Sequence, residues 1–193
     1  LYVENIFDYG FKKGSHSFDA TLGQTYKYFI SNRLSLSGEG YAVDDIKWNN
    51  MGAVANKESY GAGSEQVIKQ KLAFFMRANY NYKNRYYLTL TGRFDGASNF
   101  AANHKWGFFP SGAVKWVIAN EPWLKAEWLD DLSLKFSLGQ SGNDLNQAYR
   151  SLARMDAGSG GYPFNGSYSQ WYQQARIASP NLTWETTTMA NIA

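Results

Sequence analysis

Hydrophobic and polar residues alternate along several stretches of the chain, which is the pattern of β-strands with two different faces. The clearest stretch runs from residue 67 to 95, where a tight turn at 83–85 separates two strands and Asn84 suits a backbone with positive φ. Every second residue there is apolar or aromatic: Leu72, Phe74, Met76, Ala78, Tyr80, Tyr82, Tyr86, Leu88, Leu90 and Phe94. Weaker runs at 3–11, 17–26, 111–118, 131–138 and 182–193 bring the prediction to seven strands.

The predicted connections alternate between short and long. Short or medium ones lie at 12–15, 83–85 and 120–130, the last with a helical turn after Pro122, and long ones lie at 27–66, 96–110 and 141–180. In an up-and-down meander, successive connections emerge at opposite ends of the sheet. The chain is therefore predicted to have a short-turn end and a long-loop end, as outer-membrane barrels do.

The predicted fold class is an all-β, antiparallel, up-and-down transmembrane β-barrel. Seven strands do not close a bacterial barrel, which has an even number of strands and no free edge in the hydrocarbon. We therefore predict that residues 1–193 form part of one larger barrel domain.

Composition sharpens this picture. The chain has 14 Tyr, 12 Phe and 7 Trp, and seven aromatic residues beside the short connections are predicted to form a girdle at the lipid headgroups: Phe11, Tyr80, Tyr82, Tyr86, Tyr87, Trp123 and Trp128. The alternative is that these rings pack the end of a sandwich core. Basic residues are scattered and the net charge is +3, which does not favour nucleic acid as a partner.

Several phrases resemble the SusC/RagA family of TonB-dependent outer-membrane transporters, and the likeness spans nearly the whole chain. They are "YYLTLTGRFDGASNF", "WGFFPSGAVKWVIANEPWL", "WLDDLSLKFSLGQSGND", "SPNLTWETTT" and the opening "VENIFDYGFKKGSHSFDATLGQTYK". The resemblance implies a 22-stranded barrel in the bacterial outer membrane, with a plug domain and TonB box outside these residues. It also implies import of glycan fragments or peptides with a SusD-like lipoprotein, driven by the TonB complex.

On this reading the polar strand faces line the lumen or contact the plug, and the apolar faces contact membrane lipid. The predicted lumen-facing residues are Arg77, Asn79, Asn81, Thr89, Thr91, Arg93 and Lys135. In the loop at 96–110, Trp106, Phe108 and Phe109 are predicted to anchor at the outer headgroup level. Contacts with ligand or partner are predicted for the last long loop, at Arg154, Tyr168, Trp171 and Tyr172. Self-packing of that loop is the equal alternative.

Catalytic chemistry is not evident in the sequence. His16 and His104 lie far apart, no cysteine is present, and no metal-ligand cluster or cofactor motif is seen. We predict a transporter with no catalytic residue, metal or cofactor. Two alternatives stay open: a soluble carbohydrate-binding β-sandwich, and a β-rich hydrolase whose fold brings a carboxylate pair together.

Overall fold

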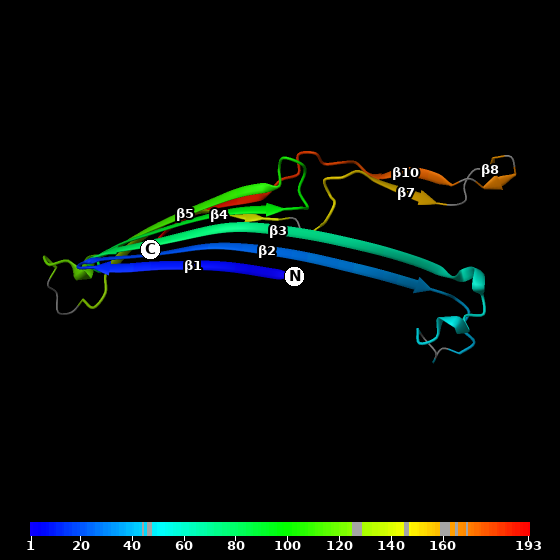
Figure 1. The fold of residues 1–193 in the computed structure, drawn as a ribbon, viewed down its shortest axis with the longest axis horizontal. Coiled ribbons are helices and arrows are strands. Elements are labelled where there is room, and N and C mark those ends of the chain that lie inside the picture. Colours follow the sequence, from blue (N-terminus) through cyan, green and yellow to red (C-terminus); the bar gives the residue numbers. More distant parts are fainter. Residues whose placement is uncertain are drawn as a thin grey trace.

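A computed structural model describes the chain except residues 44, 46, 47, 125–128, 145, 146, 159–162, 165 and 169. The main feature is one seven-stranded sheet, in which each strand pairs with the strand of the same sheet that follows it along the chain (Figure 1). Its strands are β1 (Tyr2–Lys13), β2 (His16–Ser37), β3 (Gly61–Tyr82), β4 (Tyr86–Ala97), β5 (Trp106–Val117), β6 (Ser133–Asn143) and β11 (Glu185–Ile192). Every pairing is antiparallel, so the predicted up-and-down meander is confirmed.

Short elements occupy the connections. Within the last long connection, β7 (Arg154–Gly158) pairs with β10 (Trp171–Arg176), and β8 (Pro163–Phe164) pairs with β9 (Ser167–Tyr168). The named helical elements of the described residues are the 3-10 turns η2 (Met51–Ala53), η3 (Lys57–Ser59) and η4 (Ile118–Asn120). Among the described residues, no helix is both long and apolar enough to span a membrane. The predicted helical turn after Pro122 falls partly on residues 125–128, outside the described part, and η4 comes before Pro122.

The short turns join the strands with few residues and are held by local hydrogen bonds. In the β3–β4 turn, Lys83 and Asn84 have φ values of 56° and 54°, the geometry of a type I′ hairpin. The Asn84 N–H donates to the side chain of Asn81 at 3.0 Å, and the Lys83 N–H donates to the Ser15 carbonyl of the neighbouring turn at 2.8 Å. The two short turns are thereby tied together at one end of the sheet.

Two of the three long connections are shorter than predicted. β2 and β3 are each 22 residues long and stay paired over their whole length, from His16 with Tyr82 to Ser37 with Gly61. The predicted loop at 27–66 therefore shrinks to residues 38–60, and the β2–β3 hairpin projects past the other strands (Figure 1). The predicted loop at 96–110 likewise shrinks to residues 98–105. Both predictions were wrong because the strands on either side of each loop stay hydrogen-bonded to a neighbouring strand beyond the predicted strand ends.

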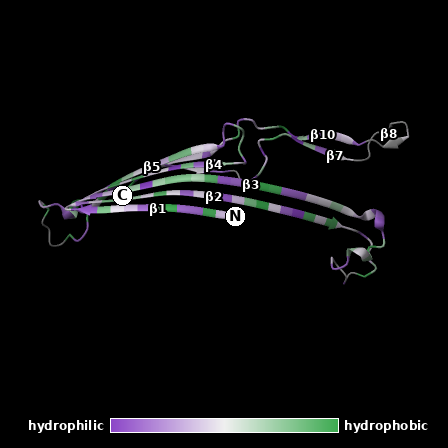
Figure 2. Cartoon of the chain, in the orientation of Figure 1, coloured by the Kyte–Doolittle hydropathy of each residue, from purple (hydrophilic) through white to green (hydrophobic). Residues whose placement is uncertain are grey.

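The sheet is a single layer with two unlike faces, because directly paired residues point to the same side. Hydrophobic and hydrophilic residues alternate along its strands (Figure 2). We call the side of Leu88 the apolar face and the side of Thr89 the polar face. Large side chains of the apolar face are open to the surroundings: Leu22, Leu90 and Phe136 are 52%, 48% and 45% exposed. A β-sandwich, the predicted alternative, would require a second sheet to cover this face. Within the described residues no second sheet does so.

Candidate functional site

A row of aromatic residues crosses the apolar face near the short turns. Pairing places His16, Tyr82, Tyr86 and Trp116 at one height on four successive strands. Neighbouring ring centroids are 4.7, 6.4 and 6.5 Å apart along the row. We call these four residues the lower row. Rings with a polar tip at one level of an apolar surface are typical of a membrane–water boundary.

A second set of aromatic residues crosses the same face near the long loops. Pairing aligns Phe74, Phe94 and Phe108 on β3, β4 and β5, and Trp106 stacks on Phe94 with ring centroids 4.8 Å apart. We call these four residues the upper row. Eight residues of β3 separate Tyr82 from Phe74, which is about 27 Å along the strand. At the usual tilt of a barrel strand this gives an apolar band about 20 Å tall, close to that of outer-membrane barrels.

Glu121 closes the lower row from the connection after η4. Its carboxylate accepts hydrogen bonds from the Tyr86 hydroxyl at 2.5 Å and from the Trp116 N–H at 2.9 Å, and Arg85 lies 3.4 Å away. The carboxylate is buried, and these donors, Tyr86 first, hold the pKa of Glu121 below its ordinary value of 4.5. Sequence reasoning missed this residue. The only signal was an acidic residue beside a Pro in a short connection, which is common in turns.

Two aromatic residues predicted for the membrane boundary lie elsewhere. Tyr87 pairs with Asn81 and Lys115 on the polar face, so its place in the girdle was wrong. Phe109 pairs with Arg93 on that face and is buried, whereas Trp106 and Phe108 are exposed on the apolar face. In both cases the preceding residue, Tyr86 or Phe108, lies on the apolar face, so the next residue along the strand points to the polar face. Trp123 is 66% exposed in its connection, and Trp128 lies outside the described residues.

The polar face carries all seven residues that were predicted to face the lumen. Cross-strand pairing joins Arg77 to Thr91 and Asn79 to Thr89, and the Thr89 hydroxyl donates to the Asn79 side chain at 3.0 Å. Asn81 lies on the same side of β3, and Lys135 pairs with Lys115 on the same side of β6. The structure thus brings these residues onto one face.

Arg93 occupies a well-defined position on the polar face. Its Nε lies 2.7 Å from an Asp95 carboxylate oxygen, and its guanidinium lies over the Phe75 ring, 5.9 Å from the centroid. The Phe75 ring in turn covers Gly23 on the neighbouring strand, where a Cβ atom would come within 2.0 Å of it. Arg93 is therefore held by an ion pair and a cation–π contact on an otherwise open surface.

Near the long loops, the polar face carries a small packed cluster that we call the aromatic shelf: Phe100, Phe109 and Trp184. The Trp184 ring lies 4.8 Å from Phe100 and 5.4 Å from Phe109, measured between centroids. The Trp184 N–H donates to the Lys105 carbonyl at 3.1 Å. Phe100 is 1% exposed. The loop at 98–105 thus folds over the polar face and is pinned there by the segment that leads into β11.

The loop residues predicted to contact ligand or partner do not form one platform. Trp171 and Tyr172 are adjacent on β10, and the ladder with β7 turns them to opposite faces. Arg154 forms an ion pair with Asp156 at 3.0 Å and lines a 790 Å³ cleft against β3, together with Lys69, Tyr149 and Arg176. Tyr168 lies on β9. Sequence reasoning did not single out Lys69, Tyr149 or Arg176, because nothing in the sequence shows that the last long loop lies against β3.

Within the described part of the chain, no group of three or more His, Cys, Asp or Glu residues is placed to hold a metal ion. The arrangement of side chains is that of a wall between two environments. One face offers an apolar band bounded by aromatic residues, and the other offers charged and hydrogen-bonding groups.

Comparison with known proteins decides the family. A profile described as "TonB dependent receptor-like, beta-barrel" matches residues 2–192. The chain belongs to this family. Membership in the TonB-dependent receptor family confirms the predicted class, an antiparallel segment of a larger barrel in the bacterial outer membrane. The soluble β-sandwich has no support from either the fold or the relatives.

Relatives of this receptor segment agree. TonB-dependent receptor P26 of Formosa agariphila is 39% identical over 98% of this chain and 19% of its own length. TonB-dependent receptor SusC of Bacteroides thetaiotaomicron is 31% identical over 92% of this chain and 17% of its own length. The chain thus spans about a fifth of the length of such relatives. Both relatives are named as TonB-dependent receptors.

Solved structures show the same fold. The RagAB peptide importer in its closed-closed state matches with a TM-score of 0.84 and 23% sequence identity, over 99% of this chain and 21% of the other. Its open-open state matches with a TM-score of 0.83.

Proposed function

We propose that the chain forms part of the barrel wall of a TonB-dependent importer of glycan fragments or peptides. The apolar face contacts lipid, and the polar face borders the lumen or contacts the plug domain. Arg77, Asn79, Asn81, Thr89, Thr91, Arg93 and Lys135 act there by hydrogen bonding and charge. The mechanism is gated passage through a polar lumen, without a chemical step.

One observation carries this proposal: an uncovered single-layer sheet has an apolar band bounded at both ends by aromatic rows. A soluble protein rarely exposes so large an apolar surface, whereas a barrel wall requires it. The band also orients the wall. Short turns face the periplasm and long loops face the outside in barrels of this class, so the cleft at Arg154 faces the exterior.

We propose that the exterior end contacts a SusD-like lipoprotein and the arriving cargo. The cleft beside β3 combines the charged groups of Arg154, Arg176, Lys69 and Glu65 with the ring of Tyr149, which suits hydroxyls, carboxylates and peptide groups alike. Arg154 therefore belongs to this contact surface. Trp171 and Tyr172 supply aromatic surface on the outlying β7–β10 hairpin, and Tyr168 stays a predicted contact. The TonB complex acts through the plug and TonB box, outside these residues.

The test is uptake by cells that lack the gene for the full-length protein. Labelled oligosaccharide and peptide mixtures are supplied to the deletion strain, to the strain complemented with the wild-type gene, and to complemented cells treated with a protonophore. We expect one mixture to enter only with the gene and without the protonophore. Equal uptake of both mixtures in all three conditions would contradict the proposal. Arg154→Ala with Arg176→Ala is then expected to lower uptake and co-purification of the lipoprotein, with Lys12→Ala at the opposite end as the control.

A further inference from the structure

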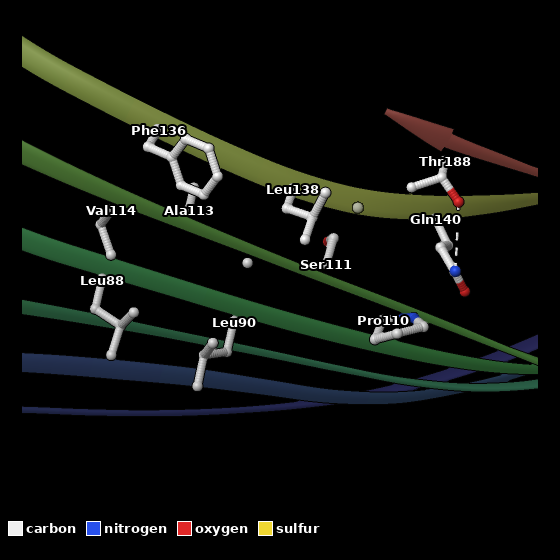
Figure 3. Close-up of a pocket in the computed structure, with 12 residues that line it drawn as sticks. Leu88, Leu90, Pro110, Ser111, Ala113, Val114, Phe136, Leu138, Gln140 and Thr188 are labelled. Carbon is white, nitrogen blue, oxygen red and sulfur yellow. Dashed lines mark hydrogen bonds between the residues drawn. The ribbon is translucent and has the colours of Figure 1, made fainter. Parts of the chain in front are cut away.

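A groove of 490 Å³ runs over β5 on the apolar face, between β4 and β6 (Figure 3). Its floor is formed by Pro110, Gly112 and Val114 of β5, and it is deepest at Gly112, which has no side chain. One wall is Leu88 and Leu90 of β4, and the other is Phe136 and Leu138 of β6. The volume lies within the range of about 300 to 1,000 Å³ that is typical of small-molecule sites.

The groove has one polar end. Gln140 and Thr188 are directly paired across β6 and β11, and the Gln140 side-chain N–H donates to the Thr188 hydroxyl at 3.4 Å (Figure 3). The Thr188 hydroxyl and the second amide hydrogen of Gln140 can each donate one more hydrogen bond. Polar side chains on a lipid-facing surface need a hydrogen-bonding partner, since the hydrocarbon offers none.

The register gives the depth of this polar end. Gly139 pairs with Ser111, and Pro110 pairs with Gly92, so Gln140 lies two residues short of Phe94 in the upper row. That is about 7 Å of strand below the predicted headgroup boundary. From Gln140 the groove continues four residues down β6 to Phe136, or about 14 Å, through the middle of the apolar band to a level about 7 Å above the lower row.

We propose that the groove binds one acyl chain of an outer-membrane lipid, with an ester or hydroxyl oxygen of that lipid at Gln140 and Thr188. This inference rests on the proposed lipid-facing side of the sheet. An acyl chain fits because the groove runs along one strand, is apolar along its walls and is polar only at the end nearest the headgroups. It is also continuous with the surface that lipid already covers. A second protein copy would need a broad complementary patch rather than a groove between two rows of side chains.

The test uses the full-length protein in nanodiscs that contain phosphatidylethanolamine with a diazirine in one acyl chain. After irradiation, adducts are mapped by mass spectrometry. We expect several-fold more adducts on the β4 and β6 walls than on Phe18 and Leu22 of β2, which share the apolar face within the same band. We also expect Gln140→Leu with Thr188→Val to reduce this excess partly.

Gly112→Leu is the decisive variant, since it fills the floor of the groove. A Cβ at Gly112 meets its nearest neighbour, Leu90 Cδ2, at 3.6 Å, so the added side chain is accommodated without a backbone clash. We expect the excess labelling of the walls to be lost. Ala20→Leu is the matched control, because pairing places Ala20 at the same depth on the same face, three strands away. Heat-modifiable migration on gels verifies that each variant is folded.

The outcomes are distinct. Uniform labelling of β2 and β4–β6, or excess labelling that survives Gly112→Leu, overturns the groove proposal and leaves the proposed function intact. Adducts absent from the whole apolar face overturn both. Crosslinks between two copies through a photoreactive residue at Leu90 show a protein occupant and overturn the lipid assignment.

Discussion

The two faces of the seven-stranded sheet are built on one backbone, yet each suits a different solvent. At one height the apolar face presents Leu88, Val114 and Phe136 on three successive strands. One residue closer to the long loops on each of these strands, the polar face presents Thr89, Ala113 and Ser137. A shift of register by one residue would exchange these sets completely. The comparison teaches that the two environments, more than any local backbone preference, specify how the strands pair.

The faces also differ in how they are covered. Side chains of the apolar face pack sideways in rows and leave the surface open, as expected where lipid is the covering partner. On the polar face, the loop at 98–105 folds over the sheet and buries Phe100 and Phe109. These two rings have therefore been withdrawn from contact with water.

A charge placed on the apolar face should show the largest difference in stability between the two faces. Leu90 lies midway between Tyr86 and Phe94, so Leu90→Arg puts a guanidinium near the middle of the apolar band. We expect a loss of about 2–4 kcal/mol in the free energy of unfolding from the bilayer. Thr89→Arg, on the polar face, should cost far less. Denaturant unfolding in liposomes measures both, and equal losses would contradict the assignment of faces.

A methyl group should distinguish the glycines of the two faces. Gly23→Ala brings a Cβ within 2.0 Å of the Phe75 ring on the polar face, and this forces Phe75 away from Arg93. We expect a cost of about 1–2 kcal/mol from overpacking. Gly112→Ala on the apolar face should be close to neutral, because its neighbours are 3.6 Å away. Thermal unfolding in detergent compares them, and a larger cost at Gly112 would reverse the expectation.

Removing the carboxylate of Glu121 should loosen the lower row by a smaller amount. Its pKa is lower in the folded than in the unfolded chain, so its stabilising contribution is complete above the ordinary value of 4.5. That contribution is lost as pH falls through the lower folded pKa. The wild type should therefore lose stability relative to Glu121→Gln as the pH falls below about 4.5. Melting temperatures from pH 7 to pH 3 measure this, and parallel curves would exclude the role of Glu121.

The smallest effect is expected from an ion pair on the polar side. Lys71 Nζ lies 2.6 Å from Asp144 in a partly exposed setting. Lys71→Gln should change the free energy of unfolding by less than about 1 kcal/mol, because water and salt screen the pair. The difference from the wild type should shrink further in 1 M salt. A change as large as that of Leu90→Arg would mean that this side is also shielded from water.

Alternation in the sequence was sufficient to predict the meander, the faces of β3 and β4 and the seven polar residues. It works because one period-2 rule governs both pairing and solvent contact. The prediction ended this strand too early. Tyr28, Ile30, Leu34 and Leu36 continue the apolar side of the alternation through the second half of β2, which only Phe29 and Asn32 interrupt. The ends of β2 and β3 depend on how far these two strands stay paired with each other. Because this hairpin continues beyond the apolar band, its hydrophobic pattern does not mark where it ends.

Contacts between distant segments were beyond the sequence. Phe109 is adjacent to Phe108, and nothing in their identities says that Trp184 will bury one ring and leave the other exposed. Glu121 likewise gains its role from Tyr86 on a strand more than thirty residues earlier. Such sites depend on which loop folds over which face, whereas local alternation reports only the face itself.

The central claim is tested most directly by nitroxide spin labels at Leu88 and at Thr89 of the full-length protein in liposomes. These neighbours differ by one residue and lie on opposite faces. We expect power saturation to show access to oxygen, which partitions into lipid, at Leu88, and access to a water-soluble nickel chelate at Thr89. The reverse pattern, with the nickel chelate reaching Leu88 and oxygen reaching Thr89, would contradict a wall that faces lipid on one side and an aqueous passage on the other.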